Sequence, residues 1–389
     1  MSPSFTAVIG SAIGVDPFNR RSWSGSSFFF FSEMKRQGLL NRAFGVEAPA
    51  VQRLLHLGRN FSPDRGVWRA RLNLDVNYRK SLTHAVGRQL TNGEKQGDVL
   101  QIGGYFSGPE ATGRQGRCFA YYDGNLAIRL RAKPPLKDIP ARLIDGALDY
   151  ERRMLPGMEK VFTMSEYLRR SFITDYGLRP EQVQTIGAGI NLDSFPPPPV
   201  GKNYEQPTVL FVGADFARKG GWELLQAWPQ VRDRFPQAEL HIVGPRELTI
   251  PPELGAGVRH HGFVSKDDPR FFDLFAKASL FVMPSLYEPF GIAPLEAMAH
   301  AIPAVVTDDW ALGEMVTSGV TGEKVPAGDT RSLADTLLEL LAAPDRLQTM
   351  GQAARQHVLD NYTWSATVTR LAAAAADRSH AAIAGQTAR

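Results

Sequence analysis

The pattern of apolar and polar positions predicts alternating strands and helices along the second half of the chain. Short apolar runs bounded by glycine or proline predict strands, and longer amphipathic segments between them predict helices. The predicted strands are 208–212, 239–243, 280–283 and 304–307. The predicted helices are 222–235, 269–278, 294–301 and 330–342. Short apolar runs of this kind suit parallel strands that helices cover on both faces.

The first half has the same rhythm in a weaker form. Its predicted strands are 6–10, 99–103, 118–122 and 161–164, and a phenylalanine-rich helix is expected from about 26 to 38. Four prolines at 196–199 favour an extended, stiff segment and mark a boundary. We therefore predict an α/β protein with two doubly wound domains, 1–197 and 198–361. A closing segment, 362–389, holds an alanine-rich helix from Trp364 to about Ala376 and a frayed polar end at 379–389.

Composition is that of a folded globular protein, with 389 residues, 43% hydrophobic and 22% charged. Residues 1–197 contain 27 Lys and Arg against 18 Asp and Glu, whereas the remainder contains 17 against 22. The basic half suits solvated side chains, an anionic lipid surface or a phosphorylated acceptor. Nucleic acid is not expected as a partner, because the basic residues are scattered and not interleaved with aromatic residues.

Cysteine content and the chain start bear on the cellular compartment. A single cysteine, Cys118, excludes an internal disulfide and a thiolate metal cage. The first residues lack the basic flank of a secretory signal, and the phenylalanine run at 28–31 is too short to cross a bilayer. We expect a cytoplasmic protein, with peripheral association at the inner membrane face left open.

A candidate anion site follows the predicted strand 208–212. Gly213 ends this strand, and Arg218 and Lys219 precede two glycines and a predicted helix. Amides at a helix start attract phosphate, and neighbouring cations add charge-assisted hydrogen bonds. An ordinary surface cluster is the alternative for these residues.

Two glutamates bracket the start of another predicted helix in the stretch SLYEPFGIAPLEAMA, 285–299. Glu288 precedes the helix and Glu296 lies about one turn inside it. Gly291 allows close approach of a ligand, and the amides of Phe290, Gly291 and Ile292 are expected to be helix-start donors. Carboxylates beside a diphosphate suit a ligand rich in vicinal hydroxyls, with a sugar at one end and a ribose at the other. Capping by Glu288 and solvation of Glu296 are the alternatives.

The remaining polar loops carry weaker signals. The loop around Val264 is a candidate for main-chain contacts to a nucleobase, although a plain loop is nearly as good an interpretation. Adjacent His260 and His261 do not indicate a metal, because neighbouring residues of a strand point to opposite faces. The sequence has no convincing Asp-x-Asp motif, and the acidic pairs at 267–268 and 308–309 suit turns or caps.

These motifs together resemble the retaining glycosyltransferases of family 4. The resemblance rests on the Arg-Lys-Gly loop, the two glutamates of 285–299, Gly313-Glu314 and the stretch VPAGD at 325–329. It is specific over about 209–329 and weaker, but consistent, over the first half. It implies the GT-B fold, in which two Rossmann-like domains face each other across a cleft that holds the donor. It also implies that the terminal helix crosses back onto the first domain.

The resemblance assigns roles to individual residues. Glu288 would bind sugar hydroxyls, Glu296 would hold the ribose, and Lys219 would contact the diphosphate. The segment Phe290, Gly291 and Ile292 would meet the sugar and the diphosphate. Ala214 stands where many members have arginine, so the second cation is either Arg218 or absent, and we assign it to Arg218.

In the first domain, the stretch WSGS at 23–26 is similar to the family's loop after its first strand, so Gly25 is counted among the donor-binding residues. Asp123 stands near the place where many members have a histidine, so we count it as a catalytic substitute. The implied partners are a nucleotide-diphosphate sugar as donor and a hydroxyl acceptor from a glycan, a lipid-linked or a small molecule.

The predicted function is therefore retaining, metal-independent transfer of a sugar, with no cofactor besides the donor substrate. The cations and the helix start would stabilise the leaving diphosphate. A nucleotide-sugar epimerase and a non-catalytic sugar-nucleotide-binding protein are the alternatives. An NAD-dependent oxidoreductase is weaker, because residues 10–14 lack the Gly-x-Gly-x-x-Gly spacing.

Overall fold

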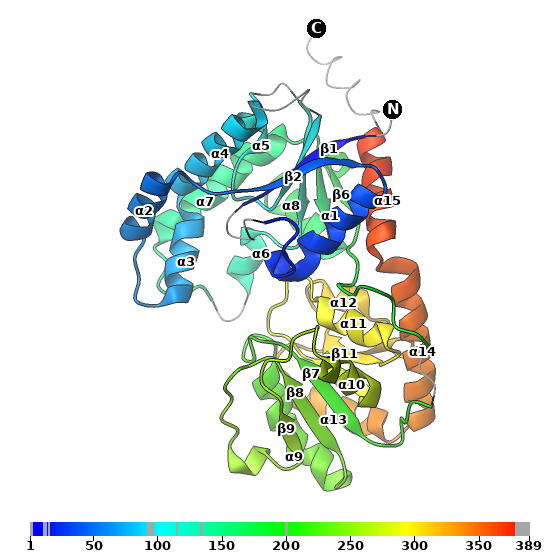
Figure 1. Ribbon diagram of the computed structural model, residues 1–389. Helices are drawn as coiled ribbons and strands as arrows, with labels where there is room; N and C mark the ends of the chain where they lie inside the picture. Colours follow the sequence, from blue (N-terminus) through cyan, green and yellow to red (C-terminus); the bar gives the residue numbers. More distant parts are fainter. Residues whose placement is uncertain are drawn as a thin grey trace. The chain divides into compact units, whose positions relative to one another are not determined.

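The chain folds into two α/β units in the computed structural model (Figure 1). The structure describes residues 3–10, 14, 16–91, 97–113, 116–132, 135–198 and 201–377. Part of the 10–14 segment, residues 199–200 of the predicted boundary and the predicted frayed end 379–389 lie outside the described residues. The N-terminal unit contains 1–131, 135–189 and 364–389, and the C-terminal unit contains 132–134 and 190–363.

A six-stranded parallel sheet forms the centre of the N-terminal unit, with the order β2-β1-β3-β4-β5-β6. Its strands are β1 (Phe5–Gly10), β2 (Leu40–Val46), β3 (Asp98–Ile102), β4 (Cys118–Tyr122), β5 (Lys160–Thr163) and β6 (Val183–Thr185). The four interior strands are those predicted from their apolar runs. The two edge strands, β2 and β6, were not predicted.

The helices of this unit include α15, which is the closing helix predicted after residue 362. They are α1 (Ser26–Arg36), α2 (Ala50–Arg59), α3 (Arg65–Leu74), α4 (Val76–Thr91), α5 (Gly108–Ala111), α6 (Leu126–Arg131), α7 (Ala141–Met154), α8 (Glu166–Thr174) and α15 (Trp364–Ala376). Helix α15 packs against α1, where the ring centroids of Phe30 and Trp364 are 5.6 Å apart. Cys118 is a buried free cysteine in β4.

A second six-stranded parallel sheet forms the centre of the C-terminal unit, with the order β12-β11-β10-β7-β8-β9. Its strands are β7 (Thr208–Val212), β8 (Glu239–Val243), β9 (Val258–His260), β10 (Leu280–Met283), β11 (Ala304–Thr307) and β12 (Gly322–Val325). The interior strands β7, β8, β10 and β11 have the predicted bounds. Their side chains are almost entirely buried, in keeping with strands that helices cover on both faces.

The C-terminal unit has six α-helices among its described residues. They are α9 (Gly221–Arg234), α10 (Pro269–Lys277), α11 (Ile292–Ala299), α12 (Leu312–Met315), α13 (Thr330–Leu341) and α14 (Pro344–Asn361). Helix α9 packs against α13, and α11 packs against α14. Helix α14 was not predicted. No helix in the described part of either unit has the length and hydrophobicity needed to cross a membrane.

The boundary between the units lies between Gly189 and Ile190, before the four prolines at which the sequence predicted it. The residues between this boundary and the prolines, 190–195, pack on the C-terminal unit. The Lys266 ammonium donates to the Asn191 carbonyl at 3.4 Å, and the Arg355 guanidinium lies 4.6 Å from the Phe195 ring centroid. At the other end the C-terminal unit runs to Thr363 and not to 361.

Candidate functional site

The strand order of the C-terminal sheet reverses between the neighbouring strands β7 and β10. Strands β7, β8 and β9 extend to one side, and β10, β11 and β12 extend to the other. Loops that follow the strands at such a switch point form the usual ligand site of an open α/β sheet. The loop after β7 carries the Arg-Lys-Gly motif, and the loop after β10 carries Glu288.

Lys219 lies directly over the backbone of Gly213 at the end of β7. A Cβ atom on Gly213 would be 2.3 Å from Lys219 Cδ, so only glycine leaves room for this arrangement. The Lys219 ammonium donates to Glu288 Oε2 at 2.7 Å and lies 3.5 Å from Met283 Sδ, at the end of β10. Neighbouring strand ends thus bring together a lysine and a glutamate that are 69 positions apart.

Arg218 contacts the same carboxylate and links the loop after β7 to the loop after β10. Its Nη1 donates to the Tyr287 carbonyl at 2.8 Å and approaches Glu288 Oε2 at 3.4 Å. Its Nε donates to Asp215 Oδ2 at 2.9 Å, and its backbone carbonyl accepts from the Leu286 amide at 2.9 Å. Burial acts to lower the pKa of Arg218, but the carboxylates of Glu288 and Asp215 outweigh it and raise that pKa.

Glu288 is held as a carboxylate by these cations. It is only 7% exposed, and burial alone would raise its pKa. The charges of Lys219 and Arg218 and their hydrogen bonds outweigh burial and lower the pKa of Glu288. The family resemblance assigns Glu288 to sugar hydroxyls, and the structure adds that the same carboxylate is the counter-ion of both cations.

Helix α11 begins at the end of the Glu288 loop without a side-chain cap. Its N-cap is Gly291, with φ of 87°, and no side chain accepts from the first amides. A Cβ atom on Gly291 would lie 2.9 Å from Glu288 Cγ, so glycine is needed for the close packing of the loop. Phe290 is buried and Ile292 is the first residue of the helix. The helix start therefore has amide donors that suit an anion.

Glu296 lies one turn further along α11 in a second ion pair. It is 2% exposed, and one of its carboxylate oxygens contacts the Lys266 ammonium. Burial raises the pKa of Glu296 more than Lys266 lowers it. Lys266 comes from the loop that also contains Val264, which is itself buried. The predicted base-contacting loop and the predicted ribose-binding glutamate are therefore adjacent.

The N-terminal unit has its own polar cluster at its switch point, where β1 and β3 are neighbours. Trp23 and Ser24, in the loop after β1, have positive φ angles of 47° and 55°, and Gly25 follows with 94°. The Trp23 indole donates to Asp123 Oδ2 at 2.9 Å, directly after β4. Its ring also packs edge-on against Tyr121, with centroids 5.5 Å apart. Gly25 and Asp123 are thus brought into one neighbourhood by Trp23.

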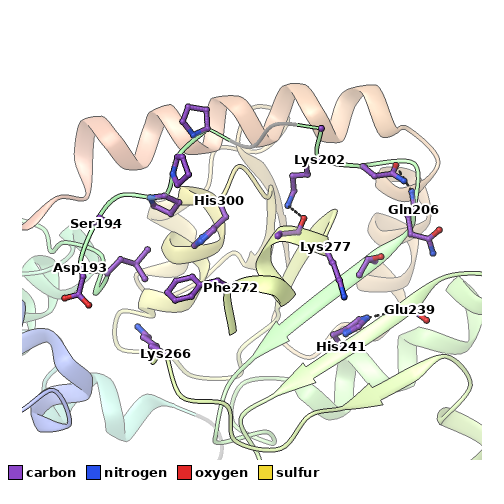
Figure 2. Close-up of a pocket in the computed structure, with 18 of the residues that line it drawn as sticks. Asp193, Ser194, Lys202, Gln206, Glu239, His241, Lys266, Phe272, Lys277 and His300 are labelled. Carbon is purple, nitrogen blue, oxygen red and sulfur yellow. Dashed lines mark hydrogen bonds and ion pairs between the residues drawn. The ribbon is translucent and has the colours of Figure 1, made fainter. Parts of the chain in front are cut away.

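A groove of about 1360 Å³ in the C-terminal unit lies beside the segments 192–198 and 201–206 and meets the candidate site at Lys266 (Figure 2). Lys266 and Asp193 lie at one end of it and Glu239 and His241 at the other, with Phe272 between them. None of the predicted site residues is among the described residues that line this groove. We assign the chemistry to the strand-end loops, because the cations, the glutamates and the uncapped helix start converge there.

The C-terminal site can bind a phosphate group and hydroxyl groups together. Its cations and helix-start amides are donors for phosphate oxygens, and its carboxylates accept from hydroxyls. Among the residues that the structure describes, no group of three His, Cys, Asp or Glu side chains is placed to hold a metal ion. His260 and His261 have other partners: the Pro245 carbonyl at 2.8 Å and the His241 ring at 2.9 Å, respectively.

The structure brings together Gly213, Arg218, Lys219 and Glu288, and places Phe290, Gly291, Ile292 and Glu296 along the following turn and helix. Sequence reasoning missed Lys266 and Asp215. Asp215 had a detectable signal, because an acid three positions before an arginine favours an ion pair. Lys266 had none, since its partner Glu296 is 30 positions away, beyond helix α10 and strand β10.

Residues 206–343 match the model of a known protein family, described as glycosyl transferases group 1. A GDP-mannose-dependent alpha-(1-6)-phosphatidylinositol monomannoside mannosyltransferase of Mycobacterium tuberculosis is 30% identical over 63% of this chain and 69% of its own length. The chain belongs to the glycosyl transferases group 1 family. A phosphatidyl-myo-inositol mannosyltransferase of Mycobacterium leprae is 35% identical over 48% of this chain, and the match spans 51% of that relative's length.

The fold also agrees with a solved glycosyltransferase structure. Sucrose-phosphate synthase from Thermosynechococcus elongatus superposes with a TM-score of 0.72, covering 95% of this chain and 97% of that one, at 18% identity. At this identity the likeness concerns the fold alone. The two Rossmann-like units of this family member are those of the GT-B fold, as the sequence predicted.

Proposed function

We propose that the chain transfers a sugar, with retention at the anomeric carbon, from a nucleotide-diphosphate sugar to an acceptor hydroxyl. The observation that carries the proposal is the cluster of Lys219, Arg218 and Glu288 beside the uncapped start of α11. One relative is named for its dependence on GDP-mannose, which supports a nucleotide sugar as donor. The relatives are named as transferases, which favours transfer over epimerisation.

In this proposal the donor diphosphate contacts Lys219 and Arg218 and the amides of Phe290, Gly291 and Ile292. Glu296 accepts hydrogen bonds from the ribose hydroxyls, and the backbone around Val264 meets the base. Glu288 accepts from sugar hydroxyls and also holds the two cations in place. This second role is supported by the short distance between Lys219 and Glu288, 2.7 Å.

The reaction breaks the bond between the anomeric carbon and the diphosphate oxygen. The acceptor oxygen forms the new bond on the face that the diphosphate leaves, and a phosphate oxygen takes the acceptor proton. Negative charge grows on the diphosphate as the bond breaks, so fixed cations and amides stabilise the transition state more than the ground state. Retention of configuration rests on the resemblance to family 4.

We propose that these protein groups stabilise the leaving diphosphate without a divalent ion. The cations Lys219 and Arg218 are partly buried, with side-chain exposures of 15% and 26%, where their charges are less screened than on an open surface. Because Glu288 neutralises part of their charge, we expect its hydrogen bonds to shift when the diphosphate binds. Activity is then expected to survive removal of divalent metal by a chelator.

The acceptor is proposed to be a hydroxyl of a glycan, a lipid-linked molecule or a small molecule. Asp123 is the candidate catalytic residue of the N-terminal unit for this step, and Gly25, which Trp23 brings near it, is a candidate donor-binding residue. A cytoplasmic location with access to the inner membrane face is proposed, since two relatives are named for phosphatidylinositol acceptors. We propose no role in binding nucleic acid.

Calorimetry against UDP-, GDP- and ADP-sugars tests this function, followed by donor hydrolysis and transfer assays with the tightest binder. We expect one base to be preferred and donor turnover to continue in the presence of a chelator. Binding without turnover with any acceptor would favour the non-catalytic alternative. Loss of activity with the chelator and recovery with magnesium or manganese would refute the metal-free mechanism.

A further inference from the structure

Helix α2 (Ala50–Arg59) of the N-terminal unit presents its apolar side chains to solvent. Val51, Leu54 and Leu55 lie on one face of the helix and are 73%, 71% and 68% exposed. Phe61, just beyond the helix end, is 60% exposed. No residue of the helix is buried. We call these four side chains the α2 face.

The side of helix α2 opposite to these apolar residues packs on the N-terminal unit through polar and aromatic contacts. His56 Nδ1 lies 3.3 Å from the Asp75 carboxylate, and its ring packs against Tyr78. The Trp68 indole, in α3, donates to the Leu57 carbonyl at 2.9 Å. The outward direction of the apolar residues is therefore built into the packing of the helix. Figure 1 shows α2 and α3 next to each other in this unit.

The surroundings of the α2 face are strongly basic. Residues 50–91 contain eight Lys and Arg against two Asp; of the eight, Arg79 is buried in an ion pair with Glu151, and Arg53 is paired with Glu47. Both aspartates already have hydrogen-bonding partners. Asp75 is buried beside His56, and Asp64 accepts from the Gly66 and Val67 amides at the start of α3. Arginines 59, 65 and 69 are exposed.

We infer that the α2 face docks on an anionic lipid surface. An amphipathic helix with apolar residues on one side and arginines around it inserts into the boundary between head groups and acyl chains. Each arginine near an anionic leaflet adds about 1 kcal/mol of attraction. Association with a second copy of this chain would bring like charges together, so the charge pattern disfavours it. The inference does not depend on the proposed transfer reaction.

Vesicle flotation of the full chain tests this inference. We expect binding to vesicles that contain phosphatidylglycerol and much weaker binding to pure phosphatidylcholine, with attraction reduced at high salt. The double variant Leu54→Gln with Leu55→Gln should lower the partition coefficient about tenfold. Arg65→Gln with Arg69→Gln should lower it about fivefold for each arginine at low salt.

The matched control changes two exposed apolar residues of the other unit, Val320→Gln and Leu359→Gln, and should leave flotation unchanged. Circular dichroism and nucleotide affinity show whether each variant is folded. Equal binding of wild type and the leucine variant to phosphatidylglycerol vesicles would overturn the inference, and so would failure of the wild type to bind. A dimer in solution that the leucine variant converts to monomer would assign the α2 face to self-association and also overturn it.

Discussion

The two glutamates of the stretch 285–299 are both buried, yet their surroundings act on them in opposite ways. Glu288 lies between two cations, which lower its pKa despite burial. Glu296 has one lysine partner that is 41% exposed, and burial raises its pKa. Two glutamates of one motif can therefore have pKa values shifted in opposite directions. The balance between burial and the neighbouring cations sets the direction of each shift.

The comparison also separates two tasks within the site. The Glu288 region concentrates charge beside the start of α11 and is suited to the reacting end of a donor. The Glu296 region lies one turn into α11, where the Lys266 side chain and the Asn191 backbone are hydrogen-bonding partners of Glu296, and is suited to binding a neutral diol. Changes in the first region should therefore affect turnover, and changes in the second should affect nucleotide affinity.

The largest effect is expected from Lys219→Ala. Removing a donor that stabilises the leaving diphosphate should lower turnover about a hundredfold to a thousandfold. Steady-state and single-turnover assays with the preferred donor would measure it. Lys277→Ala, at an exposed lysine of the same unit, is the control and should leave turnover unchanged. Equal turnover of Lys219→Ala and wild type would remove Lys219 from the mechanism.

Glu296→Ala should weaken nucleotide binding about tenfold to a hundredfold, because hydrogen bonds to a charged group are lost. Turnover at saturating donor should change much less. Calorimetry with the nucleoside diphosphate measures the affinity, and Glu253→Ala at an exposed position gives the baseline. If the affinity stays the same while turnover falls, the division of tasks between the two glutamates is reversed.

Gly213→Ala should lower turnover about tenfold while nucleotide affinity falls less, since a Cβ atom would displace Lys219 from Glu288. The comparison variant is Gly58→Ala, where no atom lies within 4 Å of an added Cβ. Thermal unfolding of both variants distinguishes a local shift from general destabilisation. Wild-type turnover in Gly213→Ala would show that the Lys219 position is not critical.

The smallest effect concerns the pH dependence of stability. Glu288, with a lowered pKa, stabilises the fold above the ordinary value of 4.5, and this contribution is lost as pH falls through the lowered pKa. Glu296, with a raised pKa, contributes most below 4.5, and this is lost as pH rises through the raised pKa.

Unfolding temperatures across acid to neutral pH would compare Glu288→Gln and Glu296→Gln with wild type. As pH rises, Glu288→Gln should lose stability relative to wild type and Glu296→Gln should gain it. Parallel curves for the three proteins would contradict the opposite pKa shifts of the two glutamates.

The interior of each sheet could be predicted from sequence, whereas the edges could not. The eight interior strands are largely buried and mostly apolar, and β10 (Leu280–Met283) is entirely so. The edge strands β2, β6, β9 and β12 have partly exposed, mixed sequences, such as Gly-Glu-Lys-Val in β12. An edge strand has a neighbouring strand on one side only and is less buried than an interior strand. Its sequence therefore lacks a continuous apolar run.

The candidate site was predictable only as far as local motifs extend. The Arg-Lys-Gly loop and the glutamate helix could each be recognised, because their roles depend on short spacing. The pairing of Lys219 with Glu288 depends on the neighbouring positions of β7 and β10, which no local pattern contains. Lys266 was missed for the same reason, and so was the contact between Trp23 and Asp123.

The most direct test of the account is a crystal structure of the chain with the nucleoside diphosphate that binds most tightly in the calorimetric panel. We predict phosphate oxygens within hydrogen-bonding distance of Lys219 and the amides at the start of α11, with the ribose hydroxyls on Glu296. A ligand seated instead in the groove lined by Asp193, Phe272 and His241, or a divalent metal bridging the phosphates and required for activity, would contradict the account.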